Sequence, residues 1–239
     1  MGCDAMKTVI IHGQNHKGST YHVGRLLVEK IAAKEDITEF FLPRDLNHFC
    51  LGCYQCMEAE EKCPFYAEKK VIMDAMEEAE VLVFTTPTYC MRASAPMKAF
   101  IDLTFINWMP HRPRKSMFHK KAVVISTAAG AGMGSAMKDI KTCLSYWGIS
   151  YIKTLGFAVQ ATKWEEVPEK RKEKIEAKTQ KLAYKVKKAK VSVGIKTRLL
   201  FLLMKMTGNN PEKLNTPMET DYLYWKNQGW FDGTTPWEL

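Results

Sequence analysis

The sequence predicts an α/β fold: a doubly wound, five-stranded parallel sheet, followed by a C-terminal helix and an aromatic tail. Short β-type runs alternate with helical patterns as far as about residue 160, and the composition changes after Lys190. Such alternation favours a parallel sheet with right-handed crossovers and with helices on both faces. The runs expected to be strands are residues 7–12, 37–42, 81–86, 122–127 and 152–159.

Helical periodicity supports the crossovers between these strands. One apolar stripe at helical spacing follows the first strand, and a second stripe precedes the third. Their members are Val23, Leu26, Leu27 and Ile31, and Ile72, Ala75, Met76 and Ala79. Parallel sheets of this kind bind ligands beyond the C-terminal ends of their strands, near the switch in strand order. We therefore expect the site in the loops after the first, third and fourth strands.

The length of 239 residues allows one domain with a full core and a small extension, so disulfides are not needed for stability. We divide the chain into a domain of residues 1–190 and an extension of residues 191–239. No run of about eighteen apolar residues occurs, and the N-terminus lacks the basic and apolar segments of a signal peptide. We therefore expect a cytoplasmic protein with reduced thiols and no membrane span.

The net charge of +9 is concentrated in one segment of the chain. Residues 163–190 hold eleven Lys or Arg against five Glu, together with apolar residues at helical spacing. A solvated helix face explains this charge better than contact with nucleic acid or a membrane, because no series of aromatic residues is interleaved for base stacking. We expect no nucleic-acid partner.

The segment after Lys190 ends in a tail that is rich in aromatic residues. Residues 191–206 are strongly apolar with three basic residues interspersed, and residues 208–211 (GNNP) stop that run. Six aromatic residues between Asp221 and Trp237 indicate docking rather than disorder. Packing on the domain or on a second subunit is expected, which favours a homodimer or a higher homo-oligomer. A membrane-surface helix is the alternative, disfavoured because the charges form no clear polar face.

The first strand is followed by a loop suited to a phosphate group. Residues 12–20 read HGQNHKGST, and a helix begins at the end of this run. Two glycines, hydroxyl groups and the positive end of a helix offer hydrogen-bond donors to an anion. The order differs from the motifs of nucleotide triphosphatases and dinucleotide domains, so a monophosphate fits better. Taken alone, the loop could equally be an ordinary turn with a helix cap.

Two further loops supply walls for a flat heterocycle. After the third strand, residues 85–91 read TTPTYCM, in which Pro87 restrains the turn and Tyr89 offers an aromatic face. A second helix is expected to start near Pro96, within the run APMKAFID. After the fourth strand, residues 126–132 read STAAGAG.

Together these three motifs resemble those of the NAD(P)H-dependent FMN reductase branch of the flavodoxin-like superfamily. They occur in the family's order, each after a strand, and cover residues 6 to about 160. The resemblance implies a flavodoxin-like fold with FMN as cofactor. Many relatives carry Arg where this chain has His16. An imidazole loses its proton near neutral pH, so this phosphate contact is expected to be weaker or to depend on pH.

The resemblance also assigns cofactor-binding residues. The phosphate group is expected to contact Gln14, His16, Ser19 and Thr20. The ribityl chain and the isoalloxazine ring are expected to contact Pro87, Thr88, Tyr89 and Met91, with Thr127, Ala128 and Gly130 along the other edge of the ring. No protein acid or base is expected to be catalytic, because hydride transfer is the chemistry of the flavin itself.

Four of the seven cysteines lie within fourteen positions, in the pattern CxxCxxCx6C. They are Cys50, Cys53, Cys56 and Cys63. The pattern resembles that of the iron–sulfur flavoproteins of the same superfamily, in which a [4Fe-4S] centre exchanges electrons with FMN. Two alternatives stay open. The cysteines could line the flavin pocket or a subunit interface without metal, as in many plain FMN reductases, or they could bind zinc.

The activity that the resemblance implies is an FMN-dependent NAD(P)H oxidoreductase that passes electrons to a small acceptor such as a quinone, nitro or azo compound. The alternatives are an iron–sulfur flavoprotein acting in electron transfer, and a non-enzymatic flavin or thiol redox carrier or sensor. His111, Arg112 and Arg114 lie in a Pro-rich loop. They are expected either to stabilise that loop or to contact the substrate or a nicotinamide phosphate.

Overall fold

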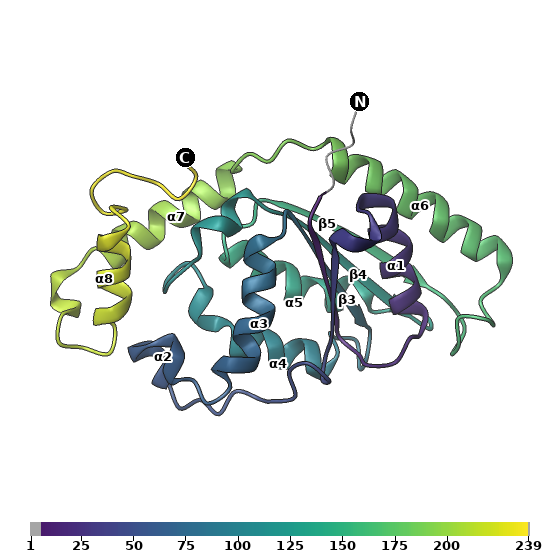
Figure 1. Ribbon diagram of the computed structural model, residues 1–239, viewed down its shortest axis with the longest axis horizontal. Helices are drawn as coiled ribbons and strands as arrows, with labels where there is room; N and C mark the ends of the chain where they lie inside the picture. The colour runs from purple at the N-terminus through teal and green to yellow at the C-terminus, as the bar shows by residue number, and fades with distance from the viewer. Residues whose placement is uncertain (1–5, 239) are drawn as a thin grey trace.

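The computed structural model describes residues 6–238 and contains the predicted sheet (Figure 1). Five parallel strands lie in the order β2-β1-β3-β4-β5, the doubly wound arrangement of a flavodoxin-like fold. The strands are β1 (Thr8–His12), β2 (Ile37–Phe41), β3 (Val81–Pro87), β4 (Lys121–Ala128) and β5 (Tyr151–Ala158). Each predicted strand is confirmed to within one residue at both ends. Residues 1–5 of the predicted domain (1–190) and residue 239 of the predicted extension (191–239) lie outside the described range.

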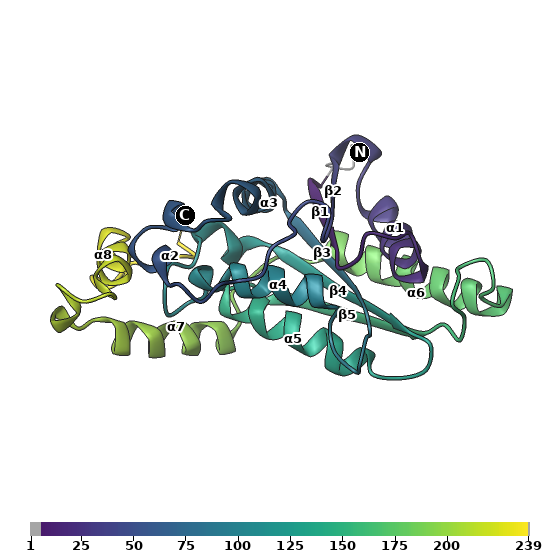
Figure 2. The same cartoon turned by 90° about the horizontal axis from the view of Figure 1, so that it is seen from below.

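Helices cover both faces of this sheet (Figures 1 and 2). On one face, α1 (Ser19–Ile31) and α6 (Glu169–Lys188) lie side by side. The other face is covered by α3 (Tyr66–Glu78), α4 (Ala95–Leu103) and α5 (Met133–Tyr146). Because both faces are covered, the central strands are continuous apolar runs, and β3 is buried from Val81 to Thr86.

The remaining helices are short or belong to the C-terminal extension. A single turn of helix, α2, contains Cys56, and the extension contains α7 and α8. Their bounds are α2 (Gln55–Glu58), α7 (Ile195–Gly208) and α8 (Glu219–Asn227). Short 3-10 helices occupy Lys34–Asp36, Glu60–Lys62, Phe105–Asn107, Lys115–His119 and Pro211–Lys213. No helix among residues 6–238 combines the length and the apolar character needed to cross a membrane.

The basic helix is shorter than the predicted segment of residues 163–190. It begins only at Glu169, directly after Pro168, and the preceding turn places the Trp164 ring in a stack on His22 of α1. The buried side of α6 includes Ile175, Leu182 and Val186. The lysines therefore lie mainly on the outer side of a helix that is packed against α1.

The C-terminal extension packs at the end of the sheet where β4 begins. Its residues Phe201, Trp225 and Trp230 form a buried cluster with Met109 and Phe118, which precede β4. The indole Nε1 of Trp225 donates a hydrogen bond to the carbonyl oxygen of His111 at 2.7 Å. Figure 1 shows α7 and α8 together beyond that end of the sheet. The extension thus lies away from the C-terminal ends of the strands.

Candidate functional site

The three loops singled out from the sequence meet at the C-terminal edge of the sheet. The backbone N–H of Thr88, after β3, donates to the carbonyl oxygen of Thr127 in β4 at 2.8 Å. The hydroxyls of Thr88 and Ser126 are 2.9 Å apart. The hydroxyls of Thr20, in the first turn of α1, and Thr127 are 2.5 Å apart. Side-chain hydrogen bonds therefore join all three loops into one surface.

Gly13 fixes the start of the first loop against its neighbours. Its N–H donates to the carbonyl oxygen of Thr85 at 2.7 Å, and its own carbonyl oxygen accepts from the hydroxyl of Ser94 at 2.6 Å. A Cβ atom at position 13 would lie 2.6 Å from Ser94 Oγ and 3.0 Å from Thr85 O. Only glycine allows the backbone to approach β3 this closely.

The N-terminus of α1 has hydrogen-bonding capacity that the protein does not use. The buried hydroxyl of Ser19 has no hydrogen-bond partner within residues 6–238. No side-chain bond caps the helix, and its first turn carries no acidic residue. A small hollow of about 10 Å³ at the same N-terminus is lined by Gln14, His16, Gly18 and Thr20, among others, but not by Ser19. A buried donor at the positive end of a helix is suited to an anion. The alternative, that the hydroxyl groups of this loop cap the helix, is wrong, because no side chain caps α1.

The buried residue His12, the last of β1, directly precedes this loop and is held by two hydrogen bonds. His12 Nε2 lies 2.9 Å from Glu39 Oε1, and Nδ1 lies 2.8 Å from the hydroxyl of Thr85. Burial lowers the pKa of His12, although the hydrogen bond to Glu39 opposes that effect. Because a carboxylate only accepts, the neutral ring carries its proton on Nε2 and accepts the Thr85 hydroxyl at Nδ1. These two hydrogen bonds of His12 connect the end of β1 to β2 and β3.

The second loop is a tight turn that presents two apolar side chains. Tyr89 and Arg92 pair with each other in antiparallel fashion, with N–O distances of 3.0 and 2.9 Å. The two residues between them, Cys90 and Met91, have φ of 48° and 63°. Left-handed backbone at two successive residues other than glycine is costly and is retained mainly at functional sites. The turn leaves the side chains of Tyr89 and Met91 about half exposed, facing solvent or a ligand.

The third loop remains open beside this turn. Ala128 ends β4, and the exposed Gly130 has open space where a Cβ would lie. Gly132 closes the loop with φ of 96°, and a Cβ there would lie 2.7 Å from the methyl group of Thr88 and 2.9 Å from the sulfur of Met91. The glycine therefore lets the second and third loops pack against each other while leaving the edge near Gly130 accessible.

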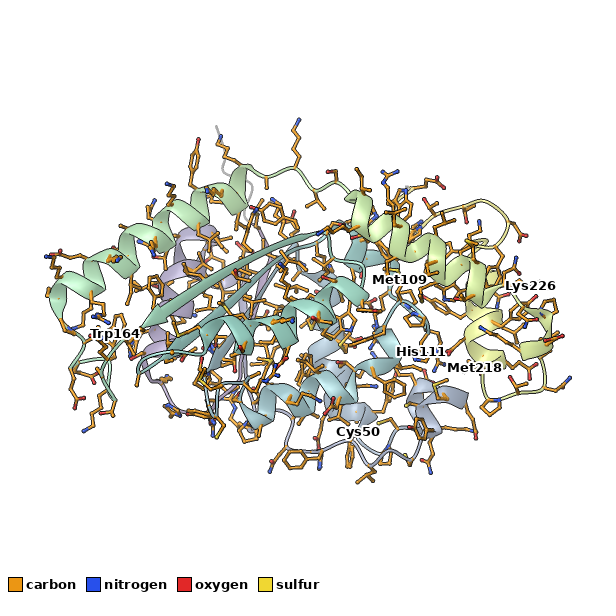
Figure 3. All side chains as sticks on the ribbon, turned by 180° about the vertical axis from the view of Figure 1, so that it is seen from behind. Cys50, Met109, His111, Trp164, Met218 and Lys226 are labelled. Atoms are coloured by element: carbon orange, nitrogen blue, oxygen red, sulfur yellow. The ribbon has the colours of Figure 1, made fainter. Side chains whose placement is uncertain are left out.

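A separate cavity gathers all four clustered cysteines. It has a volume of about 330 Å³, within the range of ligand-binding cavities. Its lining consists of Cys50, Cys53, Cys56 and Cys63 together with Leu51, Gly52, Tyr54, Pro64, Phe65, Asp102, Leu103 and Phe105. Figure 3 shows Cys50 on a loop at the margin of the molecule. In residues 6–238 no group of three or more His, Cys, Asp or Glu side chains is arranged so that it could hold a metal ion.

The thiols of this cavity affect one another electrostatically. Burial raises the pKa of Cys56, and the nearby thiols of Cys63 and Cys50 raise it further, whereas Lys69 lowers it. Cys56 is buried, Cys63 is partly buried, and the other two cysteines are exposed. Thiols are the ligand type that iron–sulfur clusters and zinc require, although in the described residues these four are not arranged around one metal position.

Charged side chains tie the cysteine loop to the C-terminal extension. Arg112 donates to the carbonyl oxygen of Cys56, and its Nε lies 3.2 Å from Oδ1 of Asp221 in α8. His111 Nδ1 lies 2.8 Å from Oδ2 of the same carboxylate. Thr220 donates its hydroxyl to the carbonyl oxygen of Glu58 at 3.0 Å. The loop that carries His111 and Arg112 therefore stabilises the protein through these contacts.

A second carboxylate extends the same network into α3. Glu60 lies 3.1 Å from the ammonium group of the fully buried Lys69 and 3.2 Å from the guanidinium group of Arg114. Arg114 also reaches Glu77 at 2.9 Å. Figure 3 shows His111 and Met218 in one half of the molecule and Trp164 at the opposite end. The basic residues of the Pro-rich loop are thus paired with protein carboxylates, far from the turn that contains Trp164.

Helix α4 connects the two candidate sites. Its N-terminus follows the Tyr89–Arg92 turn, and its last residues, Asp102 and Leu103, line the cysteine cavity. Nine residues of α-helix span about 14 Å. The two sites are therefore separate but lie at the two ends of one short helix.

Several residues of these sites could not be chosen from the sequence. Ser94 and Ser126 join the loops by hydrogen bonds, and Lys69 and Glu60 lie beside the cysteine cavity. Serine, lysine and glutamate are common surface residues, and only their contacts between distant elements distinguish these four. Ser94 has the clearest signal, because it directly precedes the expected helix start in the run APMKAFID.

Comparison with known proteins gives matches in both sequence and structure. The family model for NADPH-dependent FMN reductases matches residues 6–163. An iron–sulfur flavoprotein of Methanocaldococcus jannaschii is 33% identical over 143 residues, which cover 56% of this chain and 69% of that protein. An iron–sulfur flavoprotein of Archaeoglobus fulgidus is 23% identical over 192 residues, 76% of this chain and 79% of that protein.

Among solved structures, an FMN-dependent NADH-azoreductase from Bacillus anthracis in complex with FMN superposes with a TM-score of 0.56. The identity is 15%, and the match covers 74% of this chain and 99% of the azoreductase. At this identity the likeness concerns the fold alone. The predicted flavodoxin-like fold is confirmed.

Replacing Asp221 by Ala should lower the free energy of unfolding by about 3 kcal/mol, because it leaves the buried charge of Arg112 without its partner. Denaturant titration by circular dichroism measures this loss. The matched control is Glu58→Ala, which removes an exposed i,i+4 pair with Lys62 and should cost less than about 1 kcal/mol. Equal losses for the two variants would contradict a stabilising role of the Asp221 network.

Proposed function

This chain belongs to the NADPH-dependent FMN reductase family, in the branch that includes iron–sulfur flavoproteins, and we propose that it takes electrons from NADH or NADPH and passes them to a small acceptor. Membership of the family makes it an FMN-dependent oxidoreductase. A quinone, a nitro compound or an azo compound is the acceptor class that we propose. The observation that carries the proposal is the unpartnered, buried hydroxyl of Ser19 at the start of α1, in a loop that hydrogen bonds join to two other loops.

The residues of the three loops fit FMN. We assign the phosphate group to the first loop, where Ser19 is unpartnered, and to Gln14, His16 and Thr20 beside it. We assign the ribityl chain and the ring to Pro87, Thr88, Tyr89 and Met91, with Thr127, Ala128 and Gly130 at the other edge of the ring. The exposed faces of Tyr89 and Met91 match a flat aromatic ligand, which would cover them.

FMN, when bound, supplies the hydride and electron chemistry. The helix N-terminus would bind the phosphate group, and the restrained Tyr89–Arg92 turn would hold the ring in position. The hydrogen bonds of Thr88 to Thr127 and Ser126 keep the second and third loops together. None of these side chains needs to donate or accept a proton during the reaction.

The activity is tested with the full chain reconstituted with FMN. Oxidation of NADH and of NADPH is followed by the loss of nicotinamide absorbance, in the presence of a quinone, a nitroaromatic compound or an azo dye. We expect steady turnover with at least one donor and one acceptor. Negligible turnover with both donors would instead support a redox carrier or sensor.

Replacing Ser19 by Ala should weaken FMN binding about tenfold, because a hydrogen bond to a charged group contributes about 1.5 kcal/mol. The free energy of unfolding without FMN should stay unchanged or rise slightly, because the variant removes a buried hydroxyl that has no protein partner. Fluorescence titration with FMN and denaturant titration measure the two quantities. The control is Ser145→Ala in α5, whose hydroxyl bonds to Lys141 O. An unchanged FMN affinity for Ser19→Ala would contradict the assigned phosphate site.

A second candidate function is favoured by the cysteine cavity. All four cysteines of the CxxCxxCx6C pattern line one cavity at the far end of α4, and two matched relatives are named iron–sulfur flavoproteins. We propose that Cys50, Cys53, Cys56 and Cys63 hold a [4Fe-4S] cluster and that the protein exchanges single electrons between this cluster and FMN. The side chains of Leu103 and Phe105 would shield the cluster from water.

Protein purified without oxygen should contain about four iron atoms and a similar amount of acid-labile sulfide per chain. Cys63→Ser should lose most of this iron, whereas Cys90→Ser, which changes an exposed cysteine outside the cavity, should keep it. Metal analysis with a sulfide assay measures both variants. Zinc without sulfide would indicate a zinc site instead, and a metal-free protein would leave a plain FMN reductase.

A further inference from the structure

Helix α7 is packed through only one of its sides. Its buried residues are Thr197 and Phe201. The ring of Phe201 packs against Trp225 at a centroid distance of 4.9 Å and against Trp230 at 5.6 Å. Thr197 accepts a hydrogen bond from Ser150 at 2.8 Å. This inner side explains why the extension is ordered, and it uses only part of the apolar surface of the helix.

The outer side of α7 is also apolar. Five large side chains there are between 50% and 76% exposed, and we call them the α7 stripe. They are Ile195, Leu199, Leu202, Leu203 and Met206. Their spacing of three, four and seven residues places them on one face of the helix. Figure 2 shows α7 at the lower margin of the molecule, with α2 and α8 on its other side, so nothing described covers the stripe.

Basic side chains border this stripe. Successive helical residues are about 100° apart, which places Lys196 at one margin and Arg198 and Lys205 at the other. Helix α7 itself carries three basic residues and no acidic residue, and four further lysines lie before it, at the end of α6 and in the linker of residues 189–194. An exposed apolar stripe between two basic margins is the pattern of a helix that lies in a bilayer surface, where lysine stems extend toward the lipid headgroups.

The charge decides between the two candidate occupants of the stripe. A second copy docked by two-fold symmetry through the stripe would bring the α7 helices of both copies together, each with three basic residues and no acidic one. An anionic bilayer provides opposite charge and apolar volume at once. We propose that the α7 stripe is a membrane-docking surface that places this protein on anionic lipid bilayers, with α7 lying flat in the interface.

The proposal does not depend on the cofactor. The stripe lies on the C-terminal extension, at the opposite end of the sheet from the three loops proposed to bind FMN (Figure 1). Docking through α7 therefore leaves those loops accessible to solvent. A quinone dissolved in the bilayer would be one acceptor brought near by this arrangement.

The proposal is tested by cosedimentation of the full chain with vesicles of phosphatidylcholine alone and of phosphatidylcholine with phosphatidylserine. We expect binding to the anionic vesicles that weakens as the salt concentration rises. The double variant Leu199→Asn/Leu203→Asn should bind at least tenfold more weakly. Lys196→Gln/Lys205→Gln should lose about tenfold or more on anionic vesicles, because each basic residue near the surface adds to the attraction.

The matched control is Val71→Asn, which changes an exposed apolar residue of α3, on the other side of the molecule from α7 (Figure 2). It should bind vesicles like the unchanged protein, and circular dichroism with thermal unfolding verifies that each variant is folded. Equal vesicle binding by the stripe variant and the unchanged protein would overturn the proposal. The absence of binding to either kind of vesicle would also overturn the proposal. In that case analytical ultracentrifugation would show whether the protein is a monomer or a homodimer that Leu199→Asn/Leu203→Asn separates.

Discussion

The parallel alignment of β1, β3 and β4 is the constraint on which the candidate flavin site depends. Because the three strands run in one direction and are neighbours in the sheet, their C-terminal ends reach the same edge. The loops that follow them are then close enough for hydroxyl groups to bond directly, as Thr20 and Thr88 do with β4. Close approach also requires glycine at positions 13 and 132, where a side chain would overlap its neighbours.

A second set of interactions links the cysteine cavity to the C-terminal extension. Arg112 contacts both the backbone of the cysteine loop and the carboxylate of Asp221, and Arg114 contacts Glu60 on the same loop. The first part of this loop, residues 50–55, is exposed and has little apolar packing of its own, so ion pairs with α3 and α8 hold the loop in place. The extension therefore contributes to the geometry of the cavity although it supplies none of its cysteines.

Helix α7 illustrates how one segment can serve two environments. Its inner side completes an aromatic cluster with Trp225 and Trp230, while its outer side remains apolar between basic margins. From the sequence, the charges of residues 191–206 form no clear polar face, and a membrane-surface helix is disfavoured for that reason. The structure explains the missing polar face, because protein occupies the side of the helix where polar residues would otherwise lie.

The sequence by itself determined the strands, the order of the three loops and the clustering of the cysteines, because these are local patterns of hydrophobicity, glycine and spacing. The five strands are confirmed to within one residue, and the central strands β1, β3 and β4 were the easiest to find because strands buried on both faces are continuous apolar runs. Only the tertiary structure decided that Ser19 lacks a partner, that Lys69 is fully buried beside the cysteines, and that one side of α7 is unpaired. Those properties depend on contacts between residues that are far apart in the chain, and no local pattern encodes which of many similar polar or apolar side chains such contacts will cover.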